Sequence, residues 1–452
     1  MSLRIIVLGG GESGCGVALL ARAEGYAVRV SDAGSLSASA KAELEAAGIP
    51  YEEGGHSRDD VDELDLAVKS PGIPWGADYV AFAKTRGVRV LGEMEFCACF
   101  AERRHASLRR IGITGSNGKT TTTLLTTHLL EATGLRVAAG GNIGVSYARL
   151  LLTPAAFDWV VLELSSFQLE DIERFGVDVG TVLNLSPDHL DRYGGSFEEY
   201  AQAKYRLCRT QGAGDFWLQA GDALSRKHAE HALRGGRSAA TTVLMPAEYR
   251  AGVAVTPERV YDLRDAPLPG AHNAANASFA LAAAELAGAA PEVLAKALGS
   301  FENAPHRLEH VGYVRGVAYV NDSKATNVDA AAKALGSFDA PIVWIVGGED
   351  KGNDYALVAD HLPRLRAVVA LGLDNGKIVD AFADTGIPVF DTHALNIAIV
   401  KATEAAKRGD VVLLSPACAS FDLFRNYIDR GDRFRAAVRA LPGFGETLAT
   451  KS

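Results

Sequence analysis

The sequence has few of the features that mark membrane, secreted or nucleic-acid-binding proteins. Its 452 residues contain no apolar run long enough to cross a bilayer. The start, MSLRIIVLGGG, enters a strand-like run directly, which predicts that no signal peptide is present. The five cysteines are scattered and odd in number, so we expect reduced thiols in a cytoplasmic protein rather than disulfides or a zinc site. A net charge of −9 argues against nucleic acid as a partner.

The remaining composition is that of an ordinary globular protein, with 48% apolar and 22% charged residues. The length suggests about three domains. Apolar strand-like runs alternate with helical stretches, which predicts the α/β class. The polar stretch at residues 101–110 and the stretch at residues 301–311 read as junctions. We therefore expect domains at residues 1–105, 106–304 and 305–452.

The most specific stretch is RIGITGSNGKTTTT at residues 110–123. An apolar run leads into a glycine turn, a lysine and threonines that begin a helix, which is typical of a phosphate cradle. Lys119 is expected to reach the terminal phosphates of a nucleotide, and the Thr120 hydroxyl to bind Mg²⁺. The spacing departs from the strict pattern because Ile113 stands where the first glycine belongs. An ordinary glycine-rich turn is the alternative.

A second glycine turn, GGGESG, follows the apolar run at residues 4–8, and Asp32 ends the next strand. This pattern matches the dinucleotide fingerprint and, read alone, suggests NAD. The same turn can hold any nucleotide diphosphate. The turn SPG at residues 70–72 also follows a strand, where open α/β sheets bind ligands, although a plain turn is the alternative.

Several charged residues stand close to apolar strands of the middle segment. Glu163 ends the run DWVVLE, and a buried carboxylate is costly unless a metal or another cation lies nearby. Asp188 and His189 follow another strand in the segment that holds the phosphate cradle, which favours a functional role. Lys204 lies in a predicted helix at residues 196–210 and, on the sequence pattern alone, could be an exposed lysine.

The last segment contains a third α/β pattern. Its strand signals lie at residues 317–320, 341–346, 366–371 and 410–414. Polar loops at residues 320–327, 346–354 and 414–424 follow apolar strands, so we expect them to gather on one rim of a sheet.

The ordered motifs resemble one known family. They are GITGSNGKTTTT, GGNIG, LELSSFQLE, NLSPDHLDRY, PGAHNAAN, APHRLE, NDSKATN, GGEDKGN and LSPACASFDLF. In this order they resemble the Mur ligases, cytoplasmic enzymes that add amino acids to the peptidoglycan precursor. The cradle and HN-x-x-N are shared with folylpolyglutamate synthetases, whereas LELSSFQLE, NDSKATN and SPACASFDLF are more similar to the branch that adds D-glutamate. The resemblance runs from about residue 5 to residue 435.

The resemblance implies a fold and a reaction. The fold would have a Rossmann-like domain for the UDP-substrate, a P-loop-type domain for ATP and a Rossmann-like domain for the amino acid, each with a mostly parallel sheet flanked by helices. The reaction would be ATP-dependent ligation of D-glutamate to UDP-N-acetylmuramoyl-L-alanine through an acyl phosphate, with ADP and phosphate as products. UDP would then replace NAD at the first glycine turn. We expect a monomer without a nucleic-acid or membrane partner.

The resemblance also implies a set of residues for each ligand. The UDP-substrate is expected at Ser13, Asp32, Ser70, Gly72, Asn142, Ser165 and His189. ATP is expected at Gly115, Ser116, Asn117, Gly118, Lys119, Thr120, Thr121, Asn273, Asn276, Arg307 and Asp322. D-glutamate and the reacting groups are expected at Lys324, Thr326, Lys351, Ser420 and Tyr427. Two Mg²⁺ ions are expected at Thr120, Glu163, His189 and Lys204, with Lys204 carbamylated so that it offers oxygens. The catalytic set would be Lys119, Glu163, His189, Lys204 and Lys324.

Two residues depart from what the resemblance leads us to expect, and three rival functions stay open. Glu12 places an acid beside the expected diphosphate, and Tyr427 stands where the family carries a phenylalanine near the amino acid. One rival is a Mur ligase for another amino acid. An NAD-dependent oxidoreductase would leave the second nucleotide cradle and the loops of the last segment without a role. A nucleotide-binding regulator without turnover would leave the charged residues around the cradle without one.

Overall fold

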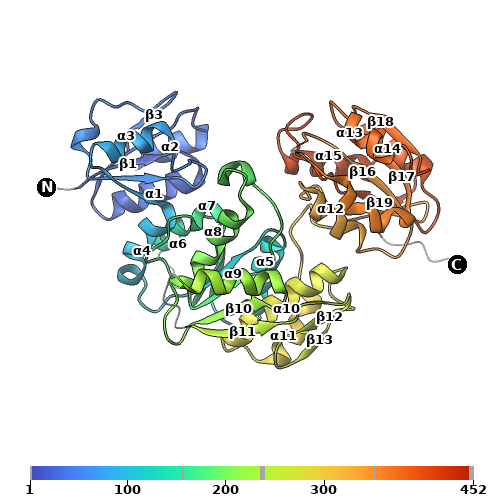
Figure 1. Ribbon diagram of the computed structural model, residues 1–452, viewed down its shortest axis with the longest axis horizontal. Coiled ribbons are helices and arrows are strands. Elements are labelled where there is room, and N and C mark those ends of the chain that lie inside the picture. Colours follow the sequence, from blue (N-terminus) through green and yellow to red (C-terminus); the bar gives the residue numbers. More distant parts are fainter. Residues whose placement is uncertain (1–2, 154–156, 235–239, 351, 447–452) are drawn as a thin grey trace. The chain divides into compact units, whose positions relative to one another are not determined.

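The computed structural model describes residues 3–153, 157–234, 240–350 and 352–446, which form two compact units (Figure 1). The first unit comprises Met1–Glu248, Val255–Val260 and Asn276–Leu298. The second unit comprises Tyr249–Ala254, Tyr261–Ala275 and Gly299–Ser452. The first unit contains two large sheets and the second unit contains one, so the chain has the three-part α/β fold that the sequence predicts.

The first sheet has five parallel strands in the order β3-β2-β1-β4-β5. The strands are β1 (Arg4–Leu8), β2 (Ala27–Ser31), β3 (Tyr51–Glu52), β4 (Leu66–Lys69) and β5 (Arg89–Gly92). The helices are α1 (Glu12–Ala23), α2 (Ala38–Ala46), α3 (Asp78–Thr85) and α4 (Glu93–Arg104), with a 3₁₀ turn, η1, at Val61–Glu63. The strand order reverses between β1 and β4, which is the point where doubly wound sheets bind ligands.

The second sheet has six parallel strands in the order β11-β10-β9-β6-β8-β7. The strands are β6 (Arg109–Thr114), β7 (Val137–Gly141), β8 (Trp159–Glu163), β9 (Val179–Val182), β10 (Phe216–Ala220) and β11 (Thr241–Met245). The helices that follow β6 to β10 are α5 (Lys119–Glu131), α6 (Tyr147–Leu152), α7 (Ser166–Leu169), η2 (Leu190–Tyr193), α8 (Phe197–Arg209) and α9 (Ala223–Arg234). Next along the chain come β12 (Val253–Val255), β13 (Val260–Asp262), α10 (Ala271–Leu286), α11 (Pro291–Ala297) and η3 (Leu298–Ser300).

The third sheet has the order β18-β17-β16-β19-β15-β14-β20 and is parallel except at β14, which pairs antiparallel with both neighbours. The strands are β14 (Glu309–Val314), β15 (Val317–Asn321), β16 (Ile342–Val346), β17 (Leu365–Leu371), β18 (Val389–Thr392), β19 (Val411–Leu414) and β20 (Phe444–Gly445). The helices are α12 (Val328–Leu335), η4 (Tyr355–Arg364), α13 (Gly376–Phe382), α14 (Leu395–Ala405) and α15 (Tyr427–Arg439).

The third sheet is buried between two helical layers, which are visible in the orange and red part of Figure 1. One core cluster joins the sheet to α12, η4 and α13, and the other joins it to α14 and α15. The four strands expected from the sequence are confirmed as β15, β16, β17 and β19. The sequence missed β14, whose first residues fall within the stretch interpreted as a junction, and it also missed β18 and β20.

The first two sheets share one hydrophobic core. The largest core cluster contains Ile5 and Val7 from β1 together with Leu150 and Leu151 from α6 and Leu162 from β8. Apolar surface from both sheets is therefore removed from water in a single cluster, and both sheets lie in one compact unit.

Ion pairs cross the same boundary and explain Glu12. Arg149 on α6 places Nε 2.8 Å from a carboxylate oxygen of Glu12 and donates from Nη2 to Glu43 at 2.5 Å. Glu12 also accepts the backbone N–H of Ser146 at 3.1 Å. The acid in the glycine turn thus pairs with α6, and it lies in the first turn of α1, where a negative charge is favourable.

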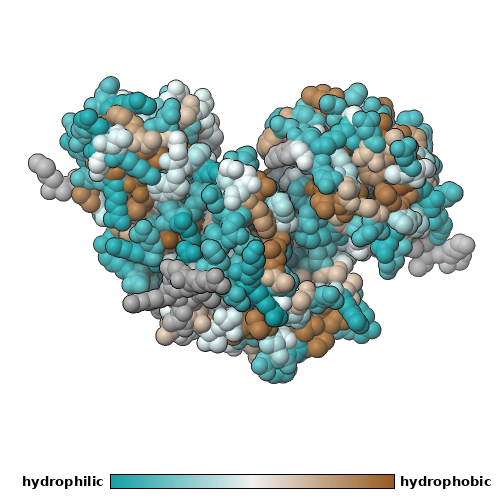
Figure 2. Space-filling view, viewed as in Figure 1, coloured by the Kyte–Doolittle hydropathy of each residue, from teal (hydrophilic) through white to brown (hydrophobic). Residues whose placement is uncertain are grey.

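The surface is mixed in character. Figure 2 shows hydrophilic residues interspersed with smaller apolar areas. The large exposed apolar side chains include Leu244, Val260, Leu357, Leu373 and Phe421, which come from different elements and loops. Scattered exposure of this kind is ordinary for protein surfaces. Within the described residues, no helix combines the length and the apolar character that crossing a membrane requires.

We expect Arg149→Ala to lower the free energy of unfolding by about 1.5–3 kcal/mol, the usual range for hydrogen bonds to charged groups. Arg136→Ala is the matched control, because the Arg136 side chain is 61% exposed in its pair with Asp158 and exposed pairs contribute at most about 1 kcal/mol. Urea unfolding measures both variants. Equal losses would contradict the bridging role of Arg149.

The contact between Arg149 and Glu43 makes the free energy of unfolding depend on pH. The Arg149 guanidinium hydrogen-bonds to Glu43 and holds the pKa of that carboxyl below its usual value of 4.5. Because the folded-state pKa is depressed, this stabilisation is present above the unfolded pKa and is lost as the pH falls through the folded pKa. The stability difference between the parent protein and Arg149→Ala is therefore expected to narrow below pH 4.5, as a series of urea titrations can measure.

Candidate active site

The phosphate cradle predicted from the sequence lies between β6 and α5. Gly115 and Gly118 have φ values of +148° and +85°, which L side chains rarely adopt. A Cβ atom on residue 118 would also lie 2.1 Å from Oδ1 of Asn276 on α10. Glycine at residue 118 therefore lets Asn276, an expected ATP residue, lie directly against the loop.

A second loop, which follows β9, supports the cradle. The backbone N–H groups of Ser116 and Asn117 donate to the carbonyl and the side-chain oxygen of Asn184, at 3.0 and 2.9 Å. The Ser116 hydroxyl donates to the carbonyl of Ser186 at 2.9 Å. These contacts hold the loop in place. The positive end of α5, whose first turn contains the buried Thr121, is then the part best suited to a phosphate.

Glu163 ends β8 beside β6 and is 3% exposed. The hydroxyl of Thr120 donates to one carboxylate oxygen at 2.6 Å, and the Asn142 side-chain amide donates to the other at 2.8 Å. The sequence predicted a nearby cation, and the structure supplies two neutral donors. A carboxylate touching a hydroxyl is an oxygen donor set of the kind that Mg²⁺ prefers, so these residues fit the expected ion.

Two lysines lie over the carbonyl groups of the cradle. Lys119 donates from Nζ to the carbonyls of Gly115 and Ser116, both at 2.9 Å. Lys204, which is 2% exposed, donates to the carbonyl of Gly115 at 3.0 Å and lies 4.6 Å from the centroid of the Tyr200 ring. The alternative that the sequence pattern left open, an exposed side chain for Lys204, is therefore wrong.

Burial lowers the pKa of Lys204 well below its usual value, and the positive charge of Lys119 lowers it further. The negative charges of Asp188 and Glu163 oppose this shift without cancelling it. The depressed pKa that carbamylation of Lys204 requires is thus present in the folded chain.

His189 occupies an unusual backbone conformation at the start of η2, with φ +51°. Its backbone N–H donates to Asp188 at 3.0 Å, and its ring packs edge-on against Phe167 with centroids 5.1 Å apart. The ring is 49% exposed. In the described parts of the chain, no three His, Cys, Asp or Glu side chains gather as a metal site. A metal role for His189 stays a prediction.

The first glycine turn is held by two expected substrate residues. Asp32 accepts the backbone N–H groups of Gly10 and Gly34, each at 2.7 Å, and Ser70 donates to the carbonyl of Gly9 at 3.3 Å. A Cβ on Gly14 would lie 1.8 Å from the carbonyl oxygen of Gly9, so α1 can approach β1 only with glycine there. Asp32 and Ser70 therefore shape the turn at the carboxyl edge of the first sheet.

The remaining expected substrate residues of the first unit, Ser13, Gly72 and Ser165, differ in their surroundings and contacts. Burial raises the pKa of the Glu93 carboxyl to about 7, and Ser13 lies close enough to that carboxyl to oppose the shift in part. Gly72 lies exposed in the turn after β4. Ser165 caps α7 and forms a reciprocal capping box with Gln168. A structural role in the chain is thus visible for Ser165.

In the second unit, the three predicted loops gather at one rim because β16, β19 and β15 are parallel neighbours. Arg430 on α15, 1% exposed, joins them. Its guanidinium donates to the hydroxyl and carbonyl of Ser323 at 3.0 and 2.9 Å, to the carbonyl of Cys418 at 3.2 Å and to that of Gly347 at 3.4 Å. The sequence did not single out Arg430, since an arginine on a helix gives no sign that it will be buried.

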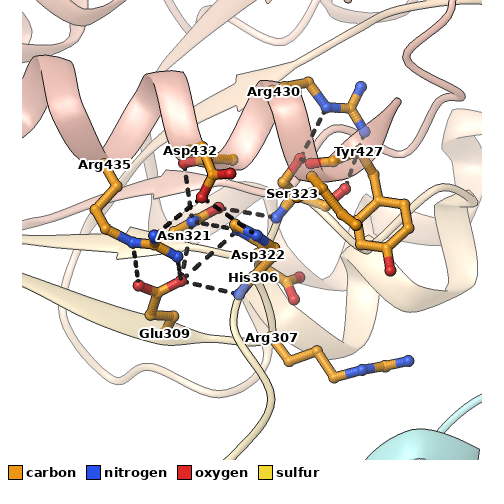
Figure 3. A network of polar contacts seen from close by, with 12 residues as sticks. His306, Arg307, Glu309, Asn321, Asp322, Ser323, Tyr427, Arg430, Asp432 and Arg435 are labelled. Atoms are coloured by element: carbon orange, nitrogen blue, oxygen red, sulfur yellow. Dashed lines mark hydrogen bonds and ion pairs between the residues drawn. The ribbon is translucent and has the colours of Figure 1, made fainter. Parts of the chain in front are cut away.

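A polar network anchors the chain segment that enters the third sheet (Figure 3). Asn321 donates to His306 at 3.0 Å and to Glu309 at 3.1 Å, and Arg435 forms two hydrogen bonds with the Glu309 carboxylate. His306 is 4% exposed and has φ +66°. The side chain of Arg307, an expected ATP residue, extends away from this network in Figure 3.

Asp322 lies at the same rim, where burial raises the pKa of its carboxyl to about 7. It accepts hydrogen bonds from the Ser415 hydroxyl at 2.8 Å and from the Leu308 backbone at 3.2 Å. The Lys324 ammonium lies 3.7 Å from the centroid of the Tyr427 ring. The tyrosine in place of phenylalanine therefore keeps an aromatic face on this lysine.

The remaining expected residues of the second unit contribute less evidence. Asn273 in α10 donates to the carbonyl of Pro269 at 2.9 Å. Ser420 is buried and Thr326 is partly buried. Lys351 lies outside the described residues.

Comparison with protein families matches three consecutive segments. Residues 4–77 match the MurD N-terminal domain, residues 113–284 match the Mur ligase middle domain, and residues 306–418 match the glutamate ligase domain of Mur ligases. A UDP-N-acetylmuramoylalanine--D-glutamate ligase of Cytophaga hutchinsonii is 43% identical over 98% of this chain and 100% of its own length. The protein of that name from Porphyromonas gingivalis is 41% identical over 96% of this chain and 98% of its own.

Solved structures share the fold at lower identity. A UDP-N-acetylmuramate-alanine ligase from Thermotoga maritima is 20% identical, with a TM-score of 0.60 over 96% of this chain and 98% of its own. A bifunctional folylpolyglutamate synthase/dihydrofolate synthase from Yersinia pestis is 18% identical, with a TM-score of 0.53 over 72% of this chain and 90% of its own. With relatives of such identity aligned along nearly its whole length, the chain belongs to the Mur ligase family.

Proposed function

We propose that this chain ligates D-glutamate to UDP-N-acetylmuramoyl-L-alanine, coupled to the cleavage of ATP to ADP and phosphate, in the synthesis of the peptidoglycan precursor. The observation that carries the proposal is the arrangement at the cradle, where Thr120 contacts the buried Glu163 and two lysines lie over the loop. The names of the relatives support the choice of substrates.

The chemistry begins with activation of a carboxylate. An oxygen of the alanine carboxylate attacks the γ-phosphorus of ATP, and the bond from that phosphorus to ADP breaks. The D-glutamate nitrogen then attacks the acyl carbon of the resulting acyl phosphate, loses a proton and forms the amide as phosphate leaves. Two anions approach each other in the first step, so positive charge at the cradle must offset their repulsion. Lys119 and the N-terminus of α5 supply that charge from the chain itself.

Thr120 and Glu163 would hold one Mg²⁺ ion, and His189 and a carbamylated Lys204 would hold the other. When bound, the ions would neutralise charge on the phosphates. A neutral amine is needed for CO₂ to add to Lys204, and the depressed pKa of this lysine supports that step. The carbamate replaces a cation by an anion with two oxygens, which suit Mg²⁺.

The second unit would bind the amino acid and part of the nucleotide. We assign D-glutamate to Lys324, Thr326, Lys351, Ser420 and Tyr427. Asn273, Asn276, Arg307 and Asp322 stay the nucleotide residues that the family resemblance implies. The gathered loops and the Lys324–Tyr427 contact support this assignment. We retain the proposed domain bounds of 1–105, 106–304 and 305–452, a cytoplasmic location and a monomeric state.

The substrate assignment predicts that phosphate release from ATP requires both UDP-N-acetylmuramoyl-L-alanine and D-glutamate. A panel with D-glutamate, L-glutamate, L-lysine, meso-diaminopimelate and glycine, followed by a phosphate assay, measures this. Strong release with another amino acid and none with D-glutamate would favour a different ligase of the same family. Release that needs no amino acid would favour a simple ATPase.

Lys119→Ala is expected to lower kcat by on the order of 10²–10³, the usual effect of losing one electrostatic donor at developing charge. The melting temperature is expected to stay close to that of the parent. The Arg264 side chain, which is 82% exposed and pairs with Asp262, gives the control Arg264→Ala, for which we expect unchanged kcat. A normal kcat for Lys119→Ala would show that its ammonium does not reach the reacting phosphate.

Lys204→Ala is expected to be nearly inactive and to regain part of its activity when small carboxylates such as acetate or formate are added. These anions can fill the space left by the side chain and supply oxygens to Mg²⁺. Electron density from crystals grown with Mg²⁺ and bicarbonate should also show an added group of carbamate size on Nζ of Lys204. Full activity of Lys204→Ala without additives would refute both the ligand role and the modification.

A further inference from the structure

Arg192 lies in η2, the 3₁₀ helix that comes next after β9, and it binds the turn that follows β4. Its Nη1 donates to the carbonyl of Gly72 at 3.1 Å. Its Nη2 donates to the carbonyls of Pro71 and Ile73, at 3.2 and 3.1 Å. One guanidinium therefore satisfies three successive carbonyl groups of a turn that lies about 120 residues away in the sequence.

Glu170 fixes the orientation of that guanidinium. Nε and Nη2 of Arg192 donate to its two carboxylate oxygens, both at 3.0 Å. The Arg192 side chain is 10% exposed and that of Glu170 is 11% exposed. A bidentate contact of this kind fixes the orientation of the guanidinium as well as its distance from the carboxylate. Because the pair is largely buried, salt screens it little.

The contact continues to the loop that carries His189. The guanidinium carbon of Arg192 lies 4.8 Å from the centroid of the Phe167 ring, and the His189 ring packs on the same phenylalanine at 5.1 Å. The backbone N–H of Arg192 also donates to the carbonyl of His189 at 3.1 Å. Arg192 thus joins the turn at residues 70–73 to His189 through direct contacts.

The two joined parts correspond to the two ends of the proposed substrate. The turn contains Ser70 and Gly72, assigned to the nucleotide-sugar, and His189 is assigned to the reacting end. A long substrate held at both ends binds tightly only if the distance between its two sites allows both to be occupied at once, and the gain in affinity is lost when the geometry prevents this. We propose that Arg192 is a positioning residue that holds the turn at residues 70–73 at a fixed distance from the loop that carries His189. The inference rests on the proposed function for the identity of the substrate.

Lysine could not perform this role. An ammonium is a compact donor without the planar fork that reaches a carboxylate and three carbonyls together. Arg192→Lys is therefore expected to behave like Arg192→Ala in substrate binding, although it keeps the charge.

Calorimetric titration with UDP-N-acetylmuramoyl-L-alanine, without D-glutamate, tests the inference on the full chain. We expect Kd for this substrate to rise at least about 10-fold in Arg192→Ala and Arg192→Lys, the lower end expected for losing a hydrogen-bonded charge. Kd for ATP should change less than about 2-fold, within the effect of an ordinary surface substitution. The control is Arg86→Ala, because Arg86 pairs with Asp62 through a side chain that is 48% exposed and lies outside this contact.

A role in stability alone would give a different pattern. It would lower the melting temperature and leave Kd of the folded protein unchanged for both ligands. Added guanidinium ion is expected to restore part of the substrate binding of Arg192→Ala, because it has the planar arrangement of N–H donors. Methylammonium, the matched cation without that arrangement, is expected not to restore it. Glu170→Gln is expected to raise Kd in the same direction, and its effect should not add to that of Arg192→Ala, because both act on one contact.

Failure of the inference and failure of the proposed function are separable. A parent protein that does not bind the UDP-substrate would refute the proposed function. A parent that binds it, with unchanged Kd in Arg192→Lys and Glu170→Gln, would overturn the role of Arg192. If Arg192→Ala does not fold, those two milder variants decide the question by the same measurement.

Discussion

The buried carboxylate of Glu163 is the constraint on which the candidate site of the first unit depends. A charge at the end of a core strand must find donors, because burying it without them is costly. The parallel pairing of β6 and β8 places this carboxylate beside the start of α5, where Thr120 donates to it. The Asn142 amide satisfies the other oxygen. One carboxylate thereby fixes the cradle, the glycine turn after β7 and the end of β8 relative to one another.

Arginine plays a comparable part at the loops of both units. Loops at the carboxyl ends of parallel strands carry carbonyl groups that no strand can pair, and a guanidinium offers five donors in one plane. Arg192 combines such carbonyls with a carboxylate, whereas the hydrogen bonds of Arg430 go to the hydroxyl of Ser323 and to three loop carbonyls. Burial lowers the pKa of Arg430 to about 10, which still leaves the side chain charged at neutral pH. The rim of the third sheet therefore contains a fixed positive charge beneath its loops.

The sequence predicts this fold well where apolar runs and glycine turns are local signals. The run RIIVL gives β1 with the expected bounds, and the glycine–lysine–threonine pattern gives the start of α5. Contacts distant in the sequence were not predictable in the same way. Glu12 looked unfavourable because its partner Arg149 comes from another segment, and Arg192 stood unnoticed beside His189. The strand β14 was hidden because its polar first residues, Glu309 and His310, resemble a junction.

The core shared by the first two sheets has a consequence for how such chains can be recombined. Side chains of β1 and α6 pack in one cluster, and Arg149 pairs with acids from α1 and α2. An N-terminal segment taken from another family member would meet apolar and charged neighbours selected for a different surface. A functional chimera would need the matching residues of α6 to be transplanted together with the first sheet. Substitutions in the first sheet and its helices should therefore be correlated with substitutions in α6 at the contacting positions. The correlation should hold even though the sequence between the two segments predicts a domain junction.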